Sequence, residues 1–546
     1  MLVHEFLQQS ADRFPDKTAL VCGEHRMSYA QIENDSNRLA HGLIAQGVER
    51  GDRVAIWLPN SVESVIAIFA ILKAGATFTV INPTTKPDKL AYILGNCAAK
   101  GLFAPRRKLP QIISLFKRLP TLRFVVSCGR GGAPPQASVP IVEFPQLLAS
   151  HADGPPPASS IDIDLACLIY TSGSTGEPKG VMSTHANVAF AASSIIQYLE
   201  NVPDDIVINV LPLAFDYGLY QLLMTFKFGG TLVLEQSFTY PAAILKRIEQ
   251  ERVTGLPGVP TIFAILLQMD LRKFNLSSIR YLTNTAAALP VEHIQRLRAA
   301  FPWARLYSMY GLTECKRTLY LPPEELDRRP GSVGIAIPGT EVWIENEAGD
   351  RLGPGEIGEL VVRGSHVMQG YWNAPEETAK RYRPGRYPAE RLLYTGDLFK
   401  MDEDGFLYFV ARKDDIIKSR GEKVAPKEVE DVIYRLPGVV EAAVIGVLDP
   451  LLGQAIKAFV VCGDGANLTE RDVLRHCAQH LEDFMVPKYV EFRESLPRTA
   501  SGKIRAAALR EEANEAEVAA VAEVAEVAEV NETSTVRDRG WNRTRE

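Results

Sequence analysis

The sequence predicts an α/β protein: a large N-terminal domain of two α/β sheet subdomains plus a β-rich subdomain, then a small α+β C-terminal domain. The chain has 546 residues, and single hydrophobic cores stop growing near roughly 250–300 residues. Apolar strands alternate with amphipathic helices up to about residue 310, which favours parallel sheets with right-handed crossovers. From Pro330 short strands and turns replace the helices. More than one domain and more than one sheet are therefore expected.

Local patterns predict the elements of the N-terminal part. Apolar residues at helical spacing between Leu2 and Leu7 predict a short opening helix. The dipeptide Gly23-Glu24 predicts a hairpin. Ser28 and Gln31 form a capping-box pattern that opens a helix. Strands are expected at Arg53–Leu58, Thr77–Ile81, Leu165–Tyr170, Ile206–Leu211, Thr231–Leu234 and Arg305–Tyr310, with a buried helix at Ser61–Ala74.

The domain boundaries follow from shifts in composition. The N-terminal domain is expected over residues 1–410, with its β-rich subdomain at about 330–410, and the C-terminal domain over 411–512, with the boundary at 411–415. In the latter, helices are expected at Glu428–Leu436 and Arg471–Leu481, and strands at Val439–Val447 and Ala455–Val461. Ala-Glu-Val triplets fill much of 513–546. A three-residue period keeps no apolar face on a helix, so a disordered low-complexity tail is expected.

Composition excludes some functional classes. A net charge of -6 argues against nucleic acid as the main partner, because phosphate backbones require a basic surface. The seven scattered cysteines form no CxxC pair, which suits a reducing cytoplasm and gives no zinc pattern. The apolar stretch Val65–Ala74 is too short to span a bilayer. A cytoplasmic enzyme without a transmembrane segment is expected.

The run Tyr170-Thr-Ser-Gly-Ser-Thr-Gly-Glu-Pro-Lys-Gly180 predicts a phosphate-binding loop. Glycines let the backbone approach an anion, hydroxyl and N–H groups donate to its oxygens, and Lys179 supplies charge. Its spacing is not that of a Walker A loop, since Pro178 precedes the lysine and Gly180 follows it.

Further runs carry groups suited to a nucleotide. Tyr310-Gly-Leu-Thr-Glu314 ends an apolar strand, where open α/β sheets bind ligands; Tyr310 offers a face for adenine and Glu314 an oxygen for a hard cation. Tyr394-Thr-Gly-Asp397 offers a carboxylate. The charged run Arg412–Lys423 and the turn Ser501-Gly-Lys503 follow.

In this order, the runs resemble the motifs of the acyl-adenylate-forming (AMP-dependent) synthetase and ligase superfamily, and the chain is closest in type to acyl-CoA synthetases. The resemblance implies ATP, Mg²⁺ and CoA, or a carrier-protein phosphopantetheine, as cofactors. Glu314 and Thr175 would hold the metal, and Asp397 and Arg412 the ribose. The implied nucleotide-binding residues are Thr171, Ser172, Gly173, Ser174, Thr175, Gly176, Lys179, Ala286, Ala287, Tyr310, Gly311, Thr313, Asp397, Arg412 and Lys503.

The resemblance also implies a reaction in two halves with domain alternation. A carboxylate attacks the α-phosphate of ATP, and Lys503, Lys179 and Glu314 with its metal act catalytically by countering charge. The small C-terminal domain is then mobile: it turns at the hinge 411–415, at Asp414, and brings in Gly421 for the pantetheine arm. Ala411 departs from the usual glycine. At the position of Lys423 many family members have arginine, and lysine lacks the bidentate hydrogen-bond donors of the guanidinium group.

The acid is the open question. The resemblance builds the acyl pocket from Phe215, Asp216, Tyr217, Val259, Thr285 and Met309. Asp216 stands where peptide-synthetase domains bind an amino group, or it is merely a helix cap. The family usually has Gly-Gly-Ala before Leu-Pro, where this chain has Thr285-Ala286-Ala287. The added side chains are expected to narrow one wall of the acyl pocket.

We therefore expect a ligase for a fatty or related acyl acid. A stand-alone enzyme that loads an amino or aryl acid onto an acyl carrier protein is the alternative, and a binding protein without catalysis is a third. His185 is expected to pack at a helix start rather than to act in catalysis.

Overall fold

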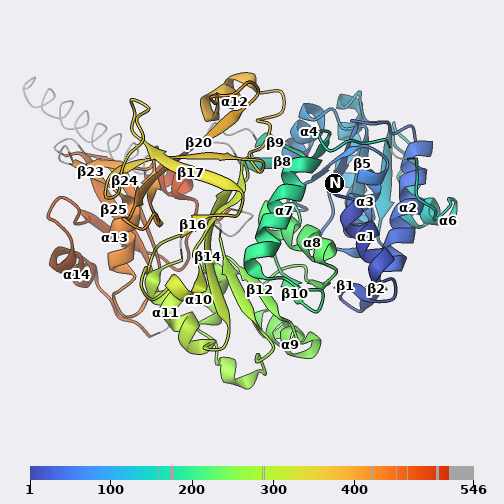
Figure 1. Cartoon of the computed structure of the whole chain (residues 1–546). Coiled ribbons are helices and arrows are strands. Elements are labelled where there is room, and N and C mark those ends of the chain that lie inside the picture. The colour runs from blue at the N-terminus through green and yellow to red at the C-terminus, as the bar shows by residue number, and fades with distance from the viewer. Residues whose placement is uncertain are drawn as a thin grey trace, which may run out of the picture. The chain divides into compact units, whose positions relative to one another are not determined.

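The computed structural model describes residues 1–515 except 134, 158, 173–177, 286, 288, 420–421, 450–451, 464, 500–502 and 514. The chain divides into two compact units, Met1–Phe409 and Val410–Glu546 (Figure 1). The predicted tail falls almost wholly outside the described residues. Among the described residues no helix is long and apolar enough to cross a membrane. All seven cysteines are described, and each is a free thiol.

A nine-stranded sheet forms one layer of the first unit, in the order β16-β15-β14-β13-β12-β10-β11-β1-β2. Its inner strands are parallel, and β2, β15 and β16 pair antiparallel at the edges. The strands are β1 (Thr18–Cys22), β2 (His25–Ser28), β10 (Ile206–Asn209), β11 (Thr231–Leu234), β12 (Gly255–Gly258), β13 (Tyr281–Asn284), β14 (Arg305–Leu312), β15 (Lys316–Tyr320) and β16 (Ile335–Ala336).

A seven-stranded sheet forms a second layer, in the order β7-β6-β5-β3-β4-β8-β9. It is parallel except for the hairpin of β8 and β9. The strands are β3 (Arg53–Ile56), β4 (Thr77–Val80), β5 (Gly101–Pro105), β6 (Phe124–Cys128), β7 (Ile141–Glu143), β8 (Leu165–Ser172) and β9 (Pro178–Thr184).

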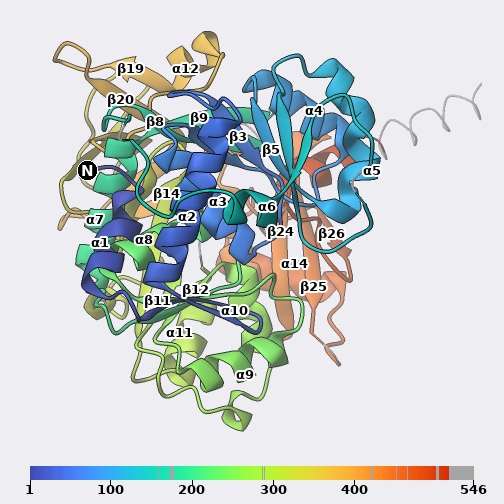
Figure 2. The same cartoon turned by 90° about the vertical axis from the view of Figure 1, so that its right-hand side faces the viewer.

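Helices cover both sheets, as parallel sheets require. Helix α3 is buried along Ser64–Lys73 and belongs to one core that contains residues of both sheets. Helices α2, α3 and α6 lie side by side in Figure 2. The helices of the first unit are α1 (Glu5–Arg13), α2 (Tyr29–Ala45), α3 (Val62–Lys73), α4 (Pro87–Asn96), α5 (Leu109–Ile112), α6 (Phe144–Ala149), α7 (His185–Leu199), α8 (Asp216–Phe228), α9 (Pro241–Glu251), α10 (Pro260–Leu266), α11 (Val291–Ala300) and α12 (Pro375–Arg381).

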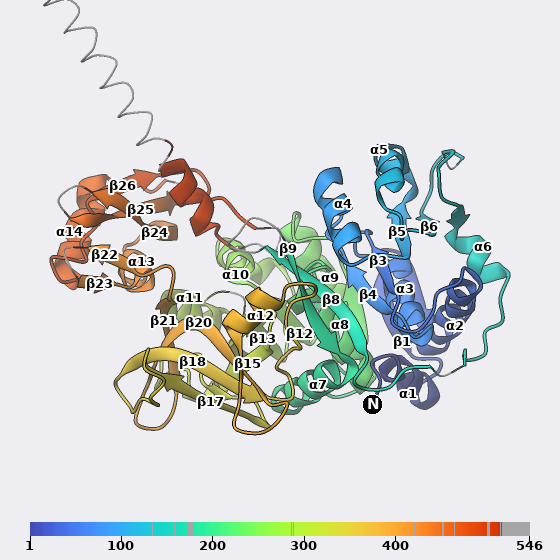
Figure 3. The same ribbon diagram turned by 90° about the horizontal axis from the view of Figure 1, so that it is seen from above.

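The β-rich part is an antiparallel sheet with its own core, seen as a separate layer in Figure 3. Its strands are β17 (Thr340–Glu345), β18 (Ile357–Gly364), β19 (Tyr382–Pro384), β20 (Arg391–Met401) and β21 (Leu407–Arg412).

The second unit packs helices on a five-stranded sheet. Its elements are β22 (Ile417–Ser419), β23 (Glu422–Val424), α13 (Pro426–Ile433), β24 (Val439–Asp449), β25 (Gly453–Cys462), α14 (Glu470–His480) and β26 (Tyr489–Phe492).

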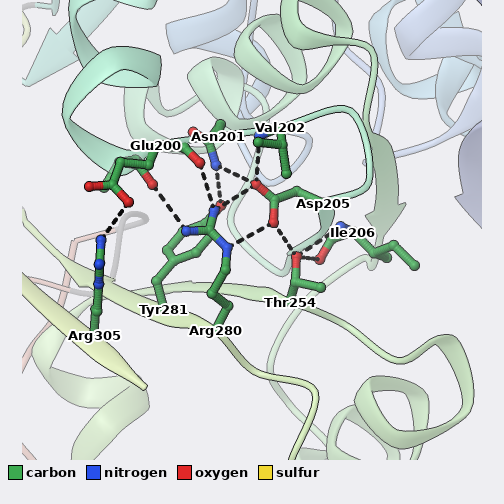
Figure 4. Close-up of polar contacts among 10 residues, drawn as sticks. Glu200, Asn201, Val202, Asp205, Ile206, Thr254, Arg280, Tyr281 and Arg305 are labelled. Carbon is green, nitrogen blue, oxygen red and sulfur yellow. Dashed lines mark hydrogen bonds and ion pairs between the residues drawn. The ribbon is translucent and has the colours of Figure 1, made fainter. Parts of the chain in front are cut away.

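A polar network ties together the amino ends of β10, β12, β13 and β14 (Figure 4). The buried carboxylate of Asp205 accepts from the Arg280 guanidinium at 2.7 Å and from the Thr254 hydroxyl at 2.8 Å. Arg305 pairs with Glu200 at 2.6 Å. Since every partner belongs to a strand start or the turn before it, this edge of the sheet is structural. The opposite edge of the sheet, at the carboxyl ends of the strands, is where open α/β sheets bind ligands.

Candidate active site

The predicted phosphate loop is partly a hairpin. Thr171 and Ser172 end β8, Pro178 opens β9, and Thr171 stands opposite Lys179 in the antiparallel ladder. Strand pairing therefore continues past the apolar residues into both ends of the predicted phosphate-binding run 170–180. The predicted residues Gly173, Ser174, Thr175 and Gly176 lie outside the described residues.

Lys179 is held beside α12. Its Nζ donates to the Glu377 carboxylate at 2.6 Å and lies 5.7 Å from the centre of the Tyr371 ring. Hydrogen bonds from Lys179 and Lys380 lower the pKa of Glu377 to about 2. Lys179 is thus oriented by a carboxylate that a bound anion would compete with.

Glu314 lies in the tight turn Thr313–Cys315 between β14 and β15. Its Oε1 accepts from the Tyr371 hydroxyl at 2.6 Å. Burial raises the pKa of Tyr371, so the phenol remains a donor. One tyrosine therefore touches both Lys179, through its ring, and Glu314, through its hydroxyl, and the two predicted groups form one cluster. Thr313 is half-buried in the same turn.

The predicted adenine and ribose residues also meet. The Tyr310 hydroxyl donates to Asp397 Oδ2 at 2.6 Å, and Asp397 is 8% exposed. The Tyr310 ring lies edge-on to Phe399, with 4.8 Å between ring centres. Strand β14 thereby links the nine-stranded sheet to the antiparallel sheet at this point.

The donor set fits Mg²⁺ held largely by substrate. In the described part of the chain no group of three or more His, Cys, Asp or Glu residues could hold a metal ion. Mg²⁺ ordinarily takes one or two carboxylates, waters and substrate phosphates. Glu314 with the phosphates of ATP meets that requirement, whereas a site built from protein ligands alone does not.

Asp216 is not the cap of α8. Phe215 is the N-cap residue and makes no side-chain cap bond, while Asp216 is the first helical residue. Its carboxylate lies 3.9 Å from the Nζ of Lys316. The cap interpretation is therefore wrong, and the carboxylate faces a buried cation instead.

The other residues predicted to line the acyl pocket lie in α8, in β14, or directly after β12 and β13. The Tyr217 hydroxyl binds the Thr283 carbonyl at 2.8 Å, and the Met309 sulfur accepts from the Tyr198 hydroxyl at 3.0 Å. Val259 and Thr285 are buried. Ala287 is exposed and its carbonyl accepts from Asn284 at 3.0 Å, whereas Ala286 is outside the described residues. The acyl pocket built from this set stays a prediction.

The remaining predicted residues belong to the second unit. Arg412 ends β21, Asp414 is exposed in the turn before β22, and Lys423 is in β23. Lys503 is half-buried, and its backbone N–H donates to the Thr499 hydroxyl at 3.1 Å. Gly421 is outside the described residues. The hinge and catalytic roles of these residues stay predictions.

His185 packs at a helix start, as predicted. It is the first residue of α7, is buried, and its Nδ1 accepts from the Val3 N–H at 3.0 Å. Burial lowers the pKa of His185 to about 3.

Sequence reasoning missed Tyr371, Glu377 and Lys316. Glu377 stands in the first turn of α12, where an acidic residue is ordinary because of the helix dipole. Tyr371 and Lys316 stand in no predicted run. Only the three-dimensional structure identifies these residues, because their side chains contact Lys179, Glu314 and Asp216.

Gly311→Ala is expected to lower pyrophosphate release at least about tenfold and to destabilise the first unit by about 1–3 kcal/mol. An added Cβ would stand 2.0 Å from the Lys316 carbonyl oxygen and 2.7 Å from the Arg317 Cα. These are backbone atoms of β15, so the hairpin that carries Tyr310 and Glu314 must shift. Acid-dependent pyrophosphate release and thermal unfolding measure the two effects.

Gly132→Ala is the matched control, because its Cβ would meet nothing within 4 Å. If both variants kept wild-type rate and stability, the tight hairpin would not set the geometry of the site.

Two family models match the chain. The AMP-binding enzyme model matches residues 7–372, and the AMP-binding enzyme C-terminal domain model matches residues 428–503. The chain is 33% identical to a long-chain-fatty-acid–CoA ligase of Bacillus subtilis (strain 168), over 94% of this chain and 95% of the relative. It is 35% identical to a feruloyl-CoA synthase of Amycolatopsis, over 91% and 96%.

Solved structures are similar over nearly the whole chain. The anthranilate CoA ligase AuaEII in complex with anthranoyl-AMP matches with a TM-score of 0.88 and 28% identity, over 95% of this chain and 98% of that one. ATP-bound MatB from Rhodopseudomonas palustris matches with a TM-score of 0.84 and 30% identity, over 94% and 99%.

Two α/β sheets, an antiparallel sheet and a small C-terminal unit, with a lysine and a carboxylate at strand ends, have the architecture of an adenylate-forming enzyme. The chain belongs to the AMP-binding enzyme family. The resemblance drawn from the motifs and the predicted fold class are thereby confirmed.

Proposed function

We propose that this protein is an AMP-forming acid–thiol ligase that activates a carboxylic acid with ATP and transfers the acyl group to CoA. The observation that carries the proposal is the cluster of Lys179, Tyr371 and Glu314 at the carboxyl ends of the strands. Its support is that relatives of nearly the same length are named as CoA ligases.

In the first half-reaction, a carboxylate oxygen bonds to the α-phosphorus of ATP and pyrophosphate leaves. Lys179 would exchange Glu377 for the leaving phosphates, and Asp397 would accept from the ribose hydroxyls. Mg²⁺, held by Glu314 and phosphate oxygens, would supply Lewis-acid neutralisation of the developing charge. Lys503 would stabilise the same charge as a mobile ammonium.

In the second half-reaction, the CoA thiolate attacks the acyl carbon and AMP leaves with the former carboxylate oxygen. The second unit would turn at Asp414 between the halves, withdrawing Lys503 and presenting the Gly421 segment. Conformational steps of this kind let one site use two sets of groups.

CoA is the acceptor that the relatives favour, since three of the four reported above carry CoA ligase or CoA synthase names. An acyl carrier protein as partner has no such support. A cytoplasmic location rests on the scattered cysteines, and the acid's identity is a separate question.

The test is a panel of fatty, aryl and dicarboxylic acids with ATP and Mg²⁺, measuring pyrophosphate release first and CoA thioester afterwards. We expect at least one acid to give both products. Absence of acid-dependent pyrophosphate release across the panel would contradict the ligase function, and release without any CoA thioester would contradict the acceptor.

A further inference from the structure

Two cations are buried side by side at the start of β15. Lys316 is 2% exposed and Arg317 is 5% exposed. Both lie over the ring of Tyr220 on α8, at 5.2 and 5.9 Å from its centre. Buried charges are rare unless they are paired.

The backbone holds both side chains toward the same helix. Neighbours in a regular strand point to opposite faces, yet Lys316 and Arg317 both reach Tyr220. Lys316 has φ 49°, the left-handed region, and the β14–β15 ladder shifts register between Tyr310 and Gly311. A non-glycine residue in this conformation is uncommon, and such outliers concentrate at binding and catalytic sites.

The positive charge is incompletely compensated. Within the described part of the chain the Nζ of Lys316 has no hydrogen-bond partner, and its ion pair with Asp216 is long at 3.9 Å. The Tyr220 hydroxyl is likewise buried without a hydrogen-bond partner there. Arg317 contacts the Tyr217 ring and, at 3.5 Å, the Met224 sulfur. These contacts are weaker than a bidentate carboxylate pair.

The pair lies where the acid is expected. Lys316 follows the nucleotide turn of Thr313 and Glu314 by two residues. Its ion-pair partner Asp216 and the Tyr217 ring under Arg317 are both predicted acyl-pocket residues. Glu314 accepts from the Tyr371 hydroxyl and is the proposed metal ligand.

We propose that Lys316 and Arg317 bind a second anionic group of the acid, so that the enzyme's substrate is a dicarboxylic acid whose distal carboxylate is buried against them. The Tyr220 hydroxyl donates to the same carboxylate. Such a group would complete the hydrogen bonds of Lys316 and Tyr220 and balance the charge. The inference rests on the proposed ligase function and adds the class of its acid.

The test compares diacids with monoacids of equal carbon number: glutarate with pentanoate, adipate with hexanoate and suberate with octanoate. We measure kcat/KM for pyrophosphate release in wild type, Lys316→Met and Tyr220→Phe. In wild type at least one diacid should exceed its monoacid at least about tenfold, because unpaired buried polar groups penalise the ligand that lacks the partner. Lys316→Met should abolish that preference through KM of the diacid while sparing the monoacid. Tyr220→Phe should weaken it with a smaller structural change.

Lys73→Met is the matched control, since Lys73 is also buried but bonds Ser36, Asn37 and Glu33 within the helical core. Its acid preference should equal that of wild type. The diacid should also raise the thermal midpoint of wild type but not of Lys316→Met, independently of turnover. Monoacids turned over as well as diacids at every length would overturn the inference and leave the ligase function standing. No pyrophosphate from any acid would overturn both.

Discussion

Lys503→Ala is expected to reduce acyl-adenylate formation on the order of 10²–10³-fold, because a preorganised cation at the charge that develops on phosphate is worth that much. Thioester formation from supplied acyl-adenylate should stay near the wild-type rate, since the second half-reaction does not use this ammonium. Acid-dependent pyrophosphate release and CoA thioester formation from synthetic acyl-AMP measure the halves separately.

Lys457→Ala controls for the loss of a lysine in the same unit, because Lys457 pairs with Glu491 at 2.8 Å on β25 and β26. It should leave both halves unchanged. An equal loss in both halves for Lys503→Ala would contradict its assignment to adenylation.

Glu314→Gln is expected to slow adenylation about 10²-fold and to raise the Mg²⁺ concentration for half-maximal rate at least about tenfold. The amide oxygen can still accept from the Tyr371 hydroxyl, so the turn keeps its geometry while the negative charge is lost. A Mg²⁺ titration of pyrophosphate release measures both effects.

Glu376→Gln is the control, since Glu376 is exposed at the start of α12 and should not alter the Mg²⁺ requirement. If Glu314→Gln left the Mg²⁺ requirement unchanged, the carboxylate would not act by holding the metal.

Local signals predicted local structure well. The capping box of Ser28 and Gln31 is present with both bonds, and the hairpin around Gly23 forms with φ 58° at that glycine. Strand β11 has the predicted bounds. These features depend on residues a few positions apart, where turn chemistry and capping decide the backbone.

Features set by tertiary pairing were not predictable. The β8–β9 hairpin extends into a Gly/Ser/Thr-rich run because the two strands pair with each other, against the local turn preference. The contact of Asp216 with Lys316 joins residues far apart in the chain, and neither neighbourhood carries a sign of it. The motif residues could be located in the sequence because contiguous runs hold them, whereas the side chains that contact Lys179 and Glu314 in space could not.

The central claim is that activation passes through an acyl-adenylate. The most direct measurement is to incubate the enzyme with ATP, CoA and an accepted acid labelled with ¹⁸O in its carboxylate. The mass of the nucleotide product is then determined by mass spectrometry. We expect AMP carrying one ¹⁸O, because the attacking carboxylate oxygen stays on phosphorus when the thiolate displaces AMP. Unlabelled AMP, or ADP as the product, would contradict it.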